Sequence, residues 1–165
     1  MCQTRGIPAA IGYARESGIP YAEGFIKNRY VGRTFIQPSQ FLREQSIKLK
    51  LSALEDQIKG KRVIMVDDSI VRGTTIKKIV GLLKEAGAKE VHVSVCSPHI
   101  KYPCFYGIDT PTKEQLISNI YTDEEIRELI HADSLHFLNI EGLKRTPHKC
   151  KLGFCTACFD GQYLI

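Results

Sequence analysis

The chain has 165 residues, of which 43% are hydrophobic and 25% charged, which is typical of a globular domain with one buried core. No run approaches the ~18 apolar residues of a membrane-spanning helix, and no basic-then-apolar signal segment is present. We therefore expect a cytoplasmic protein that has no membrane partner. The net charge of +5 is concentrated in residues 27–50. This concentration favours an anionic ligand, although a solvated basic face explains it equally well. No known nucleic-acid-binding motif is present.

The N-terminal part of the chain predicts a helix, a strand and a long loop. Pro8 to Ser17 has a first-turn proline and packing alanines, and it ends before Gly18, as helices often do. Tyr21 to Ile26 is a candidate strand. Lys27 to Pro38 is basic and lacks a clean periodicity, which predicts a mobile loop. Ile47 to Leu51 alternates apolar and basic residues, as an edge strand does.

The middle of the chain predicts a strand, a helix and a second strand. Val63 to Val66 is an uninterrupted apolar run, which suits a strand buried on both faces of a parallel sheet. Apolar residues at positions 76, 79, 80 and 83 share one helical face, and Gly87 ends that helix. Val91 to Val95 is the next strand. This spacing is typical of a right-handed βαβ unit, so we predict an α/β fold whose parallel sheet is flanked by helices.

The C-terminal part has weaker signals. Capping-box patterns at Thr112 and Thr122 predict two short helices, and Leu135 to Ile140 predicts a last strand. Residues 145–154 are polar and irregular. We treat residues 1–165 as one domain, with residues 145–165 as a cysteine-containing C-terminal segment.

Two acids and a glycine-containing turn follow the central strand. Asp67 and Asp68 lie at its carboxyl end, where open α/β sheets bind ligands. Ser69 to Thr75 then leads into a helix, whose N-terminus favours phosphate, and Gly73 allows close backbone approach. Adjacent carboxylates can accept hydrogen bonds from a vicinal diol or help to hold hydrated Mg²⁺. The stretch predicts a sugar-phosphate site, although a capped strand-to-helix loop explains each part taken alone.

Cys155 and Cys158 form a C-x-x-C pair, which can bind zinc or an iron–sulfur cluster, or form a redox disulfide. The redox interpretation is weak because the βαβ context of a thioredoxin-type pair is missing. Cys96 lies in an apolar strand, and we predict that it is a small buried hydrophobic residue. The residues that could complete a metal site are the histidines and Cys2, Cys96, Cys104 and Cys150.

The stretch from Val63 to Thr75 resembles the 5-phosphoribosyl-1-pyrophosphate (PRPP) motif of type I phosphoribosyltransferases. It occurs in one order with Lys27–Gln37, Tyr102–Asp109 and Cys155–Phe159. Together these segments resemble the phosphoribosyltransferase part of the glutamine PRPP amidotransferase family, a likeness that runs from about residue 8 to residue 163.

The resemblance implies a type I phosphoribosyltransferase-like fold and a pentosyl-transferring glycosyltransferase. The implied reaction transfers the phosphoribosyl group of PRPP to ammonia derived from glutamine and yields 5-phosphoribosylamine and pyrophosphate. It is the first step of de novo purine nucleotide biosynthesis. The resemblance also implies feedback inhibition by purine nucleotides and a homo-oligomer in the full-length enzyme.

The same resemblance implies roles for individual residues. The implied PRPP-binding residues are Asp67, Asp68, Ser69, Arg72, Gly73, Thr74 and Thr75. Asp67 and Asp68 would also hold Mg²⁺. The implied catalytic residues, on the segment that folds over PRPP, are Lys27, Tyr30 and Arg33. Three of the four ligands of a [4Fe–4S] cluster would be Cys104, Cys155 and Cys158.

Two departures from the family lead us to expect a fragment. The 165 residues contain no glutaminase domain, and residues 3–7 lack the acidic and serine pattern of the family's pyrophosphate loop. The first strand of the family's sheet is also missing, which would leave a sheet edge to be covered. We expect weak or no turnover from this chain by itself. One alternative is a non-catalytic PRPP- or nucleotide-binding regulator of the same fold. The other is a cluster- or zinc-binding interaction module.

Overall fold

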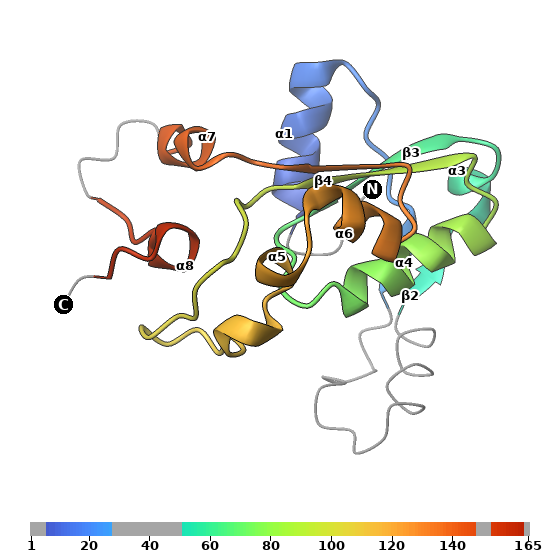
Figure 1. Ribbon diagram of the computed structural model, residues 1–165. Coiled ribbons are helices and arrows are strands. Elements are labelled where there is room, and N and C mark those ends of the chain that lie inside the picture. Colours follow the sequence, from blue (N-terminus) through green and yellow to red (C-terminus); the bar gives the residue numbers. More distant parts are fainter. Residues whose placement is uncertain (1–5, 28–50, 148–152, 164–165) are drawn as a thin grey trace.

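The computed structural model describes residues 6–27, 51–147 and 153–163 (Figure 1). The N-terminal elements are α1 (Ile7–Ser17), β1 (Phe25–Lys27), β2 (Leu51–Ala53) and α3 (Glu55–Ile58). The central unit is β3 (Arg62–Asp67), α4 (Thr74–Glu85) and β4 (Glu90–Val95). The C-terminal elements are the 3₁₀ helix η2 (Lys113–Gln115), α5 (Ile117–Ile120), α6 (Asp123–Leu129), β5 (Ser134–Phe137), α7 (Ile140–Arg145) and α8 (Ala157–Asp160). No helix in these ranges has the length and apolar character that crossing a membrane requires.

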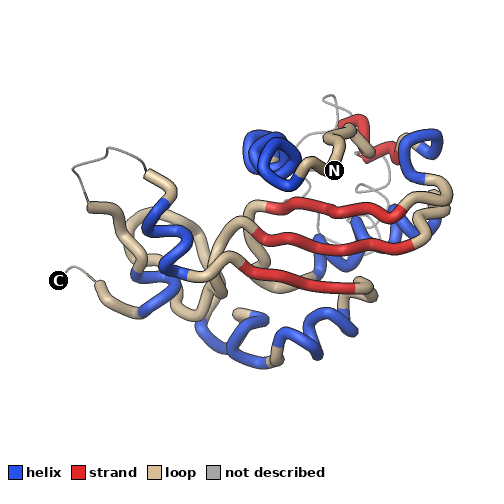
Figure 2. The backbone as a smooth tube through the Cα atoms, turned by 90° about the horizontal axis from the view of Figure 1, so that it is seen from above, coloured by secondary structure: helices blue, strands red, loops and turns tan. Residues whose placement is uncertain are grey.

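A parallel sheet of order β3-β4-β5 forms the centre of the described fold (Figure 2). Its register places Asp67 opposite Val95, at the carboxyl ends of β3 and β4. Strands β1 and β2 pair antiparallel in a separate two-stranded sheet. The predicted βαβ unit and the α/β class are confirmed. Figure 2 also shows that α7 and α8 lie beyond the carboxyl ends of the parallel strands.

The main core lies between the parallel sheet and the helices on one side of it, α4, α5 and α6 (Figure 1). The predicted face of α4 is buried, since Ile76, Ile79, Val80 and Leu83 are each at most 2% exposed. They pack with the alternate strand residues Val91, Val93 and Val95, which point to this side because side chains alternate along a strand. The hydrophobic periodicity of the sequence therefore identified this face correctly.

The opposite face of β3 is covered by α1. Ile64 and Val66 alternate with the core residues of β3 and line a small cavity together with Ala10, Tyr13 and Ala14 of α1. This packing confirms the prediction that the central strand is covered on both faces. Among the described residues, β3 is also an edge strand of its sheet. The prediction of a missing first strand remains a prediction.

The predictions for the N-terminal part are correct for the helix and less accurate afterwards. Helix α1 ends at Gly18, whose φ of 71° is the left-handed conformation expected of a terminating glycine. The predicted strand Tyr21–Ile26 is wrong in extent, because the observed strand begins at Phe25 and pairs with β2. Most of the predicted loop Lys27–Pro38 and of the strand Ile47–Leu51 falls outside the described residues.

The C-terminal predictions have mixed outcomes. The Thr122 capping box is present, with the Thr122 N–H donating to Glu125 Oε2 at 2.8 Å. The Thr112 box is wrong, since Thr112 makes no capping hydrogen bond and a 3₁₀ helix follows it. Strand β5 ends at Phe137 because Asn139 begins helix α7, accepting a hydrogen bond from the Gly142 N–H at 2.6 Å. The predicted strand to Ile140 is therefore too long.

Candidate functional site

Asp67 and Asp68 form an acid pair at the carboxyl end of β3. Asp67 is 8% exposed, and it is the one polar or charged residue that is buried in the described part of the chain. Its Oδ1 accepts a hydrogen bond from the Asp68 N–H at 3.0 Å, while its main-chain oxygen accepts one from the Cys96 N–H at 2.9 Å. Asp68 is half-buried, and its Oδ1 accepts a hydrogen bond from the Ser69 hydroxyl at 3.3 Å.

The environment of Asp67 makes its charged form costly. Burial, and to a smaller extent the nearby negative charge of Asp68, raise the pKa of Asp67 to about 6, against a smaller opposing effect of the Asp68 N–H. A cation or a hydrogen-bond donor that binds beside Asp67 would lower the free-energy cost of its charged form. Perturbed acids of this kind are common at functional sites.

A loop connects the acid pair to the N-terminus of α4. Gly73 is the N-cap of α4 and adopts a φ of 75°, a left-handed conformation that favours glycine. The helix is 12 residues long, has no side-chain cap and has no acidic residue in its first turn. Thr74 and Thr75 are exposed at this end. An uncapped helix N-terminus with exposed hydroxyls next to it can bind an anion such as phosphate.

The loop rests on a second segment of the chain, residues 113–120. The Ile117 N–H donates to the Val71 oxygen at 2.9 Å, and Arg72 Nη2 donates to Gln115 Oε1 at 2.9 Å. The predicted PRPP-binding residue Arg72 is thus paired with a side chain 43 positions further along the chain. Sequence reasoning missed both contacts, because Gln115 was assigned only to the Thr112 capping-box pattern and Ile117 belongs to no recognisable motif.

Cys96 is less buried than the sequence analysis predicts. It is half-buried, so the prediction of a buried hydrophobic residue is wrong. Burial raises the pKa of the Cys96 thiol, and the negative charges of Asp67 and Asp68 raise it further, which places the thiol near the acid pair. The signal in the sequence was the alternation of β4, since Cys96 continues the half-buried row of His92 and Ser94 rather than the buried row of valines.

The roles predicted for the three catalytic residues rest on side chains that lie outside the described part of the chain. Lys27 is the last residue of β1, and only its main chain is described. Tyr30 and Arg33 lie outside the described residues. The acid pair and residues 69–75 therefore make up the described part of the candidate site.

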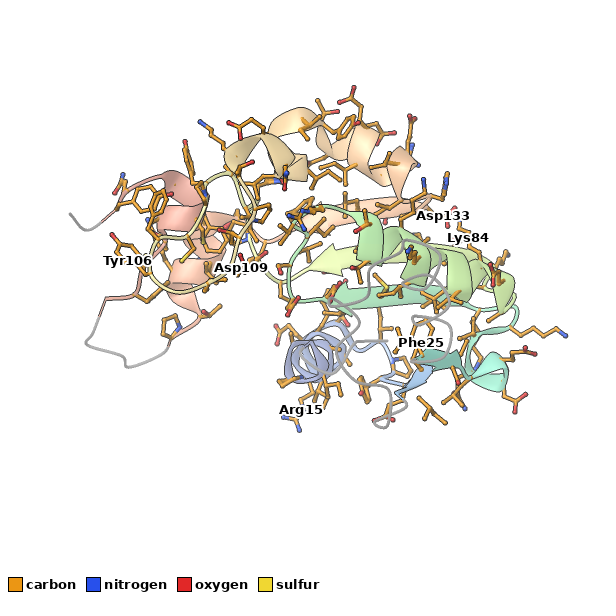
Figure 3. All side chains as sticks on the ribbon, turned by 90° about the horizontal axis from the view of Figure 1, so that it is seen from below. Arg15, Phe25, Lys84, Tyr106, Asp109 and Asp133 are labelled. Carbon is orange, nitrogen blue, oxygen red and sulfur yellow. The ribbon has the colours of Figure 1, made fainter. Side chains whose placement is uncertain are left out.

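Helix α8 (Ala157–Asp160), which contains Cys158, lies beside the loop that carries Tyr106 and Asp109 (Figure 3). Burial raises the pKa of the Cys158 thiol, and the neighbouring Cys104 and Cys155 raise it further. The Cys158 oxygen accepts hydrogen bonds from the Lys101 and Tyr102 N–H groups at 3.0 and 3.1 Å. All three cysteines are free thiols. As they stand, no group of three or more metal-ligating side chains among the described residues could hold a metal ion.

Comparisons with known proteins agree with this geometry. The family model for the phosphoribosyl transferase domain matches residues 2–102. An amidophosphoribosyltransferase of Bacillus subtilis is 60% identical over 161 residues, which cover 95% of this chain and 34% of the relative. A chloroplastic amidophosphoribosyltransferase 1 of Arabidopsis thaliana is 56% identical over 160 residues, covering 97% of this chain and 28% of the relative.

A solved structure shows the same arrangement of the chain. It is the glutamine PRPP amidotransferase of B. subtilis complexed with ADP and GMP, which matches with a TM-score of 0.83 and 58% identity. The match covers 98% of this chain and 36% of that one. The chain thus spans about a third of the length of the relatives that it matches. On this evidence the chain belongs to the phosphoribosyl transferase domain family.

Proposed function

We propose that this chain is the phosphoribosyltransferase part of an amidophosphoribosyltransferase, which transfers the phosphoribosyl group of PRPP to ammonia. The observation that carries the proposal is the acid pair Asp67–Asp68 followed by the uncapped N-terminus of α4, at the carboxyl end of a parallel strand. An acid pair suits a ribose diol, and a helix N-terminus suits its 5-phosphate. The two therefore fit the two ends of one phosphoribosyl group.

Each residue of the site has a proposed task in this reaction. Asp68, the more accessible acid, accepts hydrogen bonds from the ribose hydroxyls, while Asp67 adds negative charge behind it. Residues 69–75 bind the 5-phosphate through main-chain N–H groups and the hydroxyls of Ser69, Thr74 and Thr75, with the Arg72 cation nearby. The oxygen donors of the acid pair also suit Mg²⁺, which would neutralise charge on the departing pyrophosphate.

Lys27, Tyr30 and Arg33 are proposed to close over bound PRPP. The cationic side chains of Lys27 and Arg33 would face the negative charge that develops on pyrophosphate, and closure would exclude water, which otherwise hydrolyses an activated sugar. This role is proposed from the resemblance of the segment 27–37 alone.

The wider setting is proposed from the relatives. The name of the B. subtilis structure supports glutamine as the source of ammonia, and its complex with ADP and GMP supports inhibition by purine nucleotides. A second similar solved structure is described as the allosteric regulatory enzyme of purine biosynthesis, which supports purine synthesis as the pathway. We propose a cytoplasmic homo-oligomer as the working state of the full-length enzyme. Within it, residues 1–165 would form part of one domain, with residues 145–165 as its cysteine-containing segment.

We also propose that Cys104, Cys155 and Cys158 are three ligands of a [4Fe–4S] cluster. The proposal is supported by their soft thiolate donors, which such clusters require, and by their mutual electrostatic influence. A fourth donor and some rearrangement are needed, since the described residues offer no ready metal site. Cys2 and Cys150 lie outside the described residues and are candidates for the fourth ligand.

The first test compares PRPP binding with turnover. Calorimetry with PRPP and Mg²⁺ should detect binding, and Asp67→Asn and Asp68→Asn should each weaken it at least about tenfold. Asp68→Asn removes a charged hydrogen bond to the ribose, which is worth ~1.5–3 kcal/mol, and Asp67→Asn removes a negative charge that would attract Mg²⁺. Thr74→Ala should have a smaller effect, since main-chain N–H groups share the phosphate.

Pyrophosphate release with PRPP, Mg²⁺ and ammonium then separates an enzyme from a regulator. Release that Asp68→Asn abolishes supports the transferase. Binding without release, in a protein that also contains the rest of the relatives' length, would favour the non-catalytic regulator. Unchanged affinity in both Asp variants would remove the diol assignment.

The second test uses the buried charge of Asp67. Its pKa in the fold, about 6, exceeds the ordinary value of 3.8, so the folded chain binds the proton more tightly than the unfolded chain does. Stability from this group is therefore present below about pH 4 and is lost as the pH rises through about 6, by about 3 kcal/mol in total. Asp67→Asn should raise the Tm at pH 8 while weakening PRPP binding, and the gain should disappear near pH 4.

Asp133 provides a control, because its pKa is lowered in the fold whereas the pKa of Asp67 is raised. Its Oδ2 accepts a hydrogen bond from the Val91 N–H at 2.7 Å and lies 3.5 Å from Lys84 Nζ (Figure 3). The Val91 N–H, and more weakly the charge of Lys84, hold the pKa of Asp133 below its usual value, so its charged form stabilises the fold. Asp133→Asn should lower the Tm at pH 8. A lower Tm for Asp67→Asn at pH 8 would contradict the account of Asp67.

The third test concerns the cysteines. After anaerobic purification, the protein should contain iron and acid-labile sulfide, and Cys158→Ser should lose both, because the cluster would lose a ligand. Cys96→Ser is the matched control and should keep its iron, since Cys96 lies by the acid pair. Zinc in place of iron would support the metal-binding module instead, and the absence of both metals would refute the cluster.

A further inference from the structure

The side chain of Ile117 occupies the space beneath the candidate phosphate loop. A Cβ built on Gly73 would lie 2.5 Å from Ile117 Cδ1, which is closer than real Cβ contacts allow. The next nearest atoms, Ile117 Cγ1 and Leu129 Cδ2, are both 3.9 Å away, an ordinary contact distance. Gly73 is therefore required here for two separate reasons, its φ of 75° and the methyl group of Ile117.

The main chain of Ile117 also contacts the same loop. Its N–H donates to the Val71 oxygen at 2.9 Å, two residues before Gly73. On the preceding turn, Gln115 accepts a hydrogen bond from Arg72 at 2.9 Å. Residues 71, 72 and 73 thus each contact the segment 115–117, which fixes the path of the chain into α4.

Ile117 can act in this way because it is itself held in place. It is 2% exposed and belongs to the main hydrophobic core. Helix α5 is tied to the loop after β4 through Asn119, whose Nδ2 donates to the oxygens of Lys101 and Lys113 at 2.8 and 3.0 Å. The Ser118 hydroxyl lies 3.2 Å from His99 Nδ1. Because the Ile117 side chain is almost fully buried in this packed core, its methyl group cannot move away without displacing neighbouring side chains.

We propose that Ile117, 44 positions after Gly73, is a positioning residue of the phosphate-binding loop. Its Cδ1 methyl group fixes how closely the main chain at Gly73 can approach the hydrophobic core. The proposal rests on the proposed function, because it takes residues 69–75 to be the phosphate site. It does not depend on any catalytic contact by Ile117 itself. It adds a residue outside the motif to those that determine how well the motif binds its ligand.

The proposal is tested by a double-mutant cycle on the full chain. Ile117→Val removes only the Cδ1 methyl group, so it should loosen the loop and also make room for a Cβ at position 73. Gly73→Ala alone should weaken PRPP binding at least about tenfold, through both the clash and the backbone strain. In the Ile117→Val background, the same change should cost at least about threefold less affinity, since only the strain remains.

Ile58→Val is the matched control, because Ile58 is fully buried in the same core but lies in α3, beside the amino end of β3. It should lower the Tm about as much as Ile117→Val does and leave the cost of Gly73→Ala unchanged. Equal costs of Gly73→Ala in all three backgrounds would overturn the proposal.

Hydrogen exchange provides a readout that does not need a ligand. Peptides covering residues 70–77 should exchange faster in Ile117→Val than in Ile58→Val, since the Lys77 N–H bond to the Gly73 oxygen depends on the position of the loop. If the unmodified chain fails to bind PRPP, the proposed function fails, and the exchange result still decides whether Ile117 positions the loop. Equal exchange in the two variants would refute the positioning role.

Discussion

The candidate site depends on a carboxylate that the fold holds in an unfavourable place. Asp67 is buried at the end of β3, directly after the apolar run Val63–Val66, and Asp68 adds a second negative charge next to it. At neutral pH, this arrangement lowers the stability of the folded chain. A bound cation or a sugar hydroxyl would offset that loss of stability. The acid pair therefore lowers stability at neutral pH, and such an arrangement is common at functional sites.

The rest of the described structure holds the N-terminus of α4, the proposed phosphate site, near these acids. The pairing of β3 with β4 fixes Asp67 opposite Val95, and the packing of α4 on the sheet fixes where the helix begins. The segment 113–120 supports the loop between them from below. The acid pair and the N-terminus of α4 are thus held in place by the pairing of β3 with β4, by the packing of α4 on the sheet and by the segment 113–120. This explains why residues far from the motif can influence it.

The sequence predicted the central unit well, because its signals are local. Four apolar residues at helical spacing identified the buried face of α4, and the apolar run Val63–Val66 identified β3. The acids and Gly73 follow directly in the chain, so the position of the site could be predicted as well. The functional assignment came from a resemblance, and the family match and the relatives agree with it.

Other features could not be predicted because they depend on contacts between distant residues. The support of Gly73 by Ile117 joins positions 44 apart, and neither residue signals the other. Cys96 was misassigned because it directly follows an apolar strand that ends in the buried Val95, whereas its own side chain continues the half-buried row of His92 and Ser94. Helix α7 replaced the end of a predicted strand because the cap at Asn139 outweighed an apolar residue at position 140.

The most direct test of the account is a titration with ribose 5-phosphate, followed through the backbone amide signals of the ¹⁵N-labelled chain. This ligand carries the diol and the phosphate but cannot react. We predict that the largest shifts occur at Asp68 and at Gly73, Thr74 and Thr75, where hydroxyls and phosphate would bind. Shifts confined to other parts of the chain, with these four amides unchanged, would contradict the central claim.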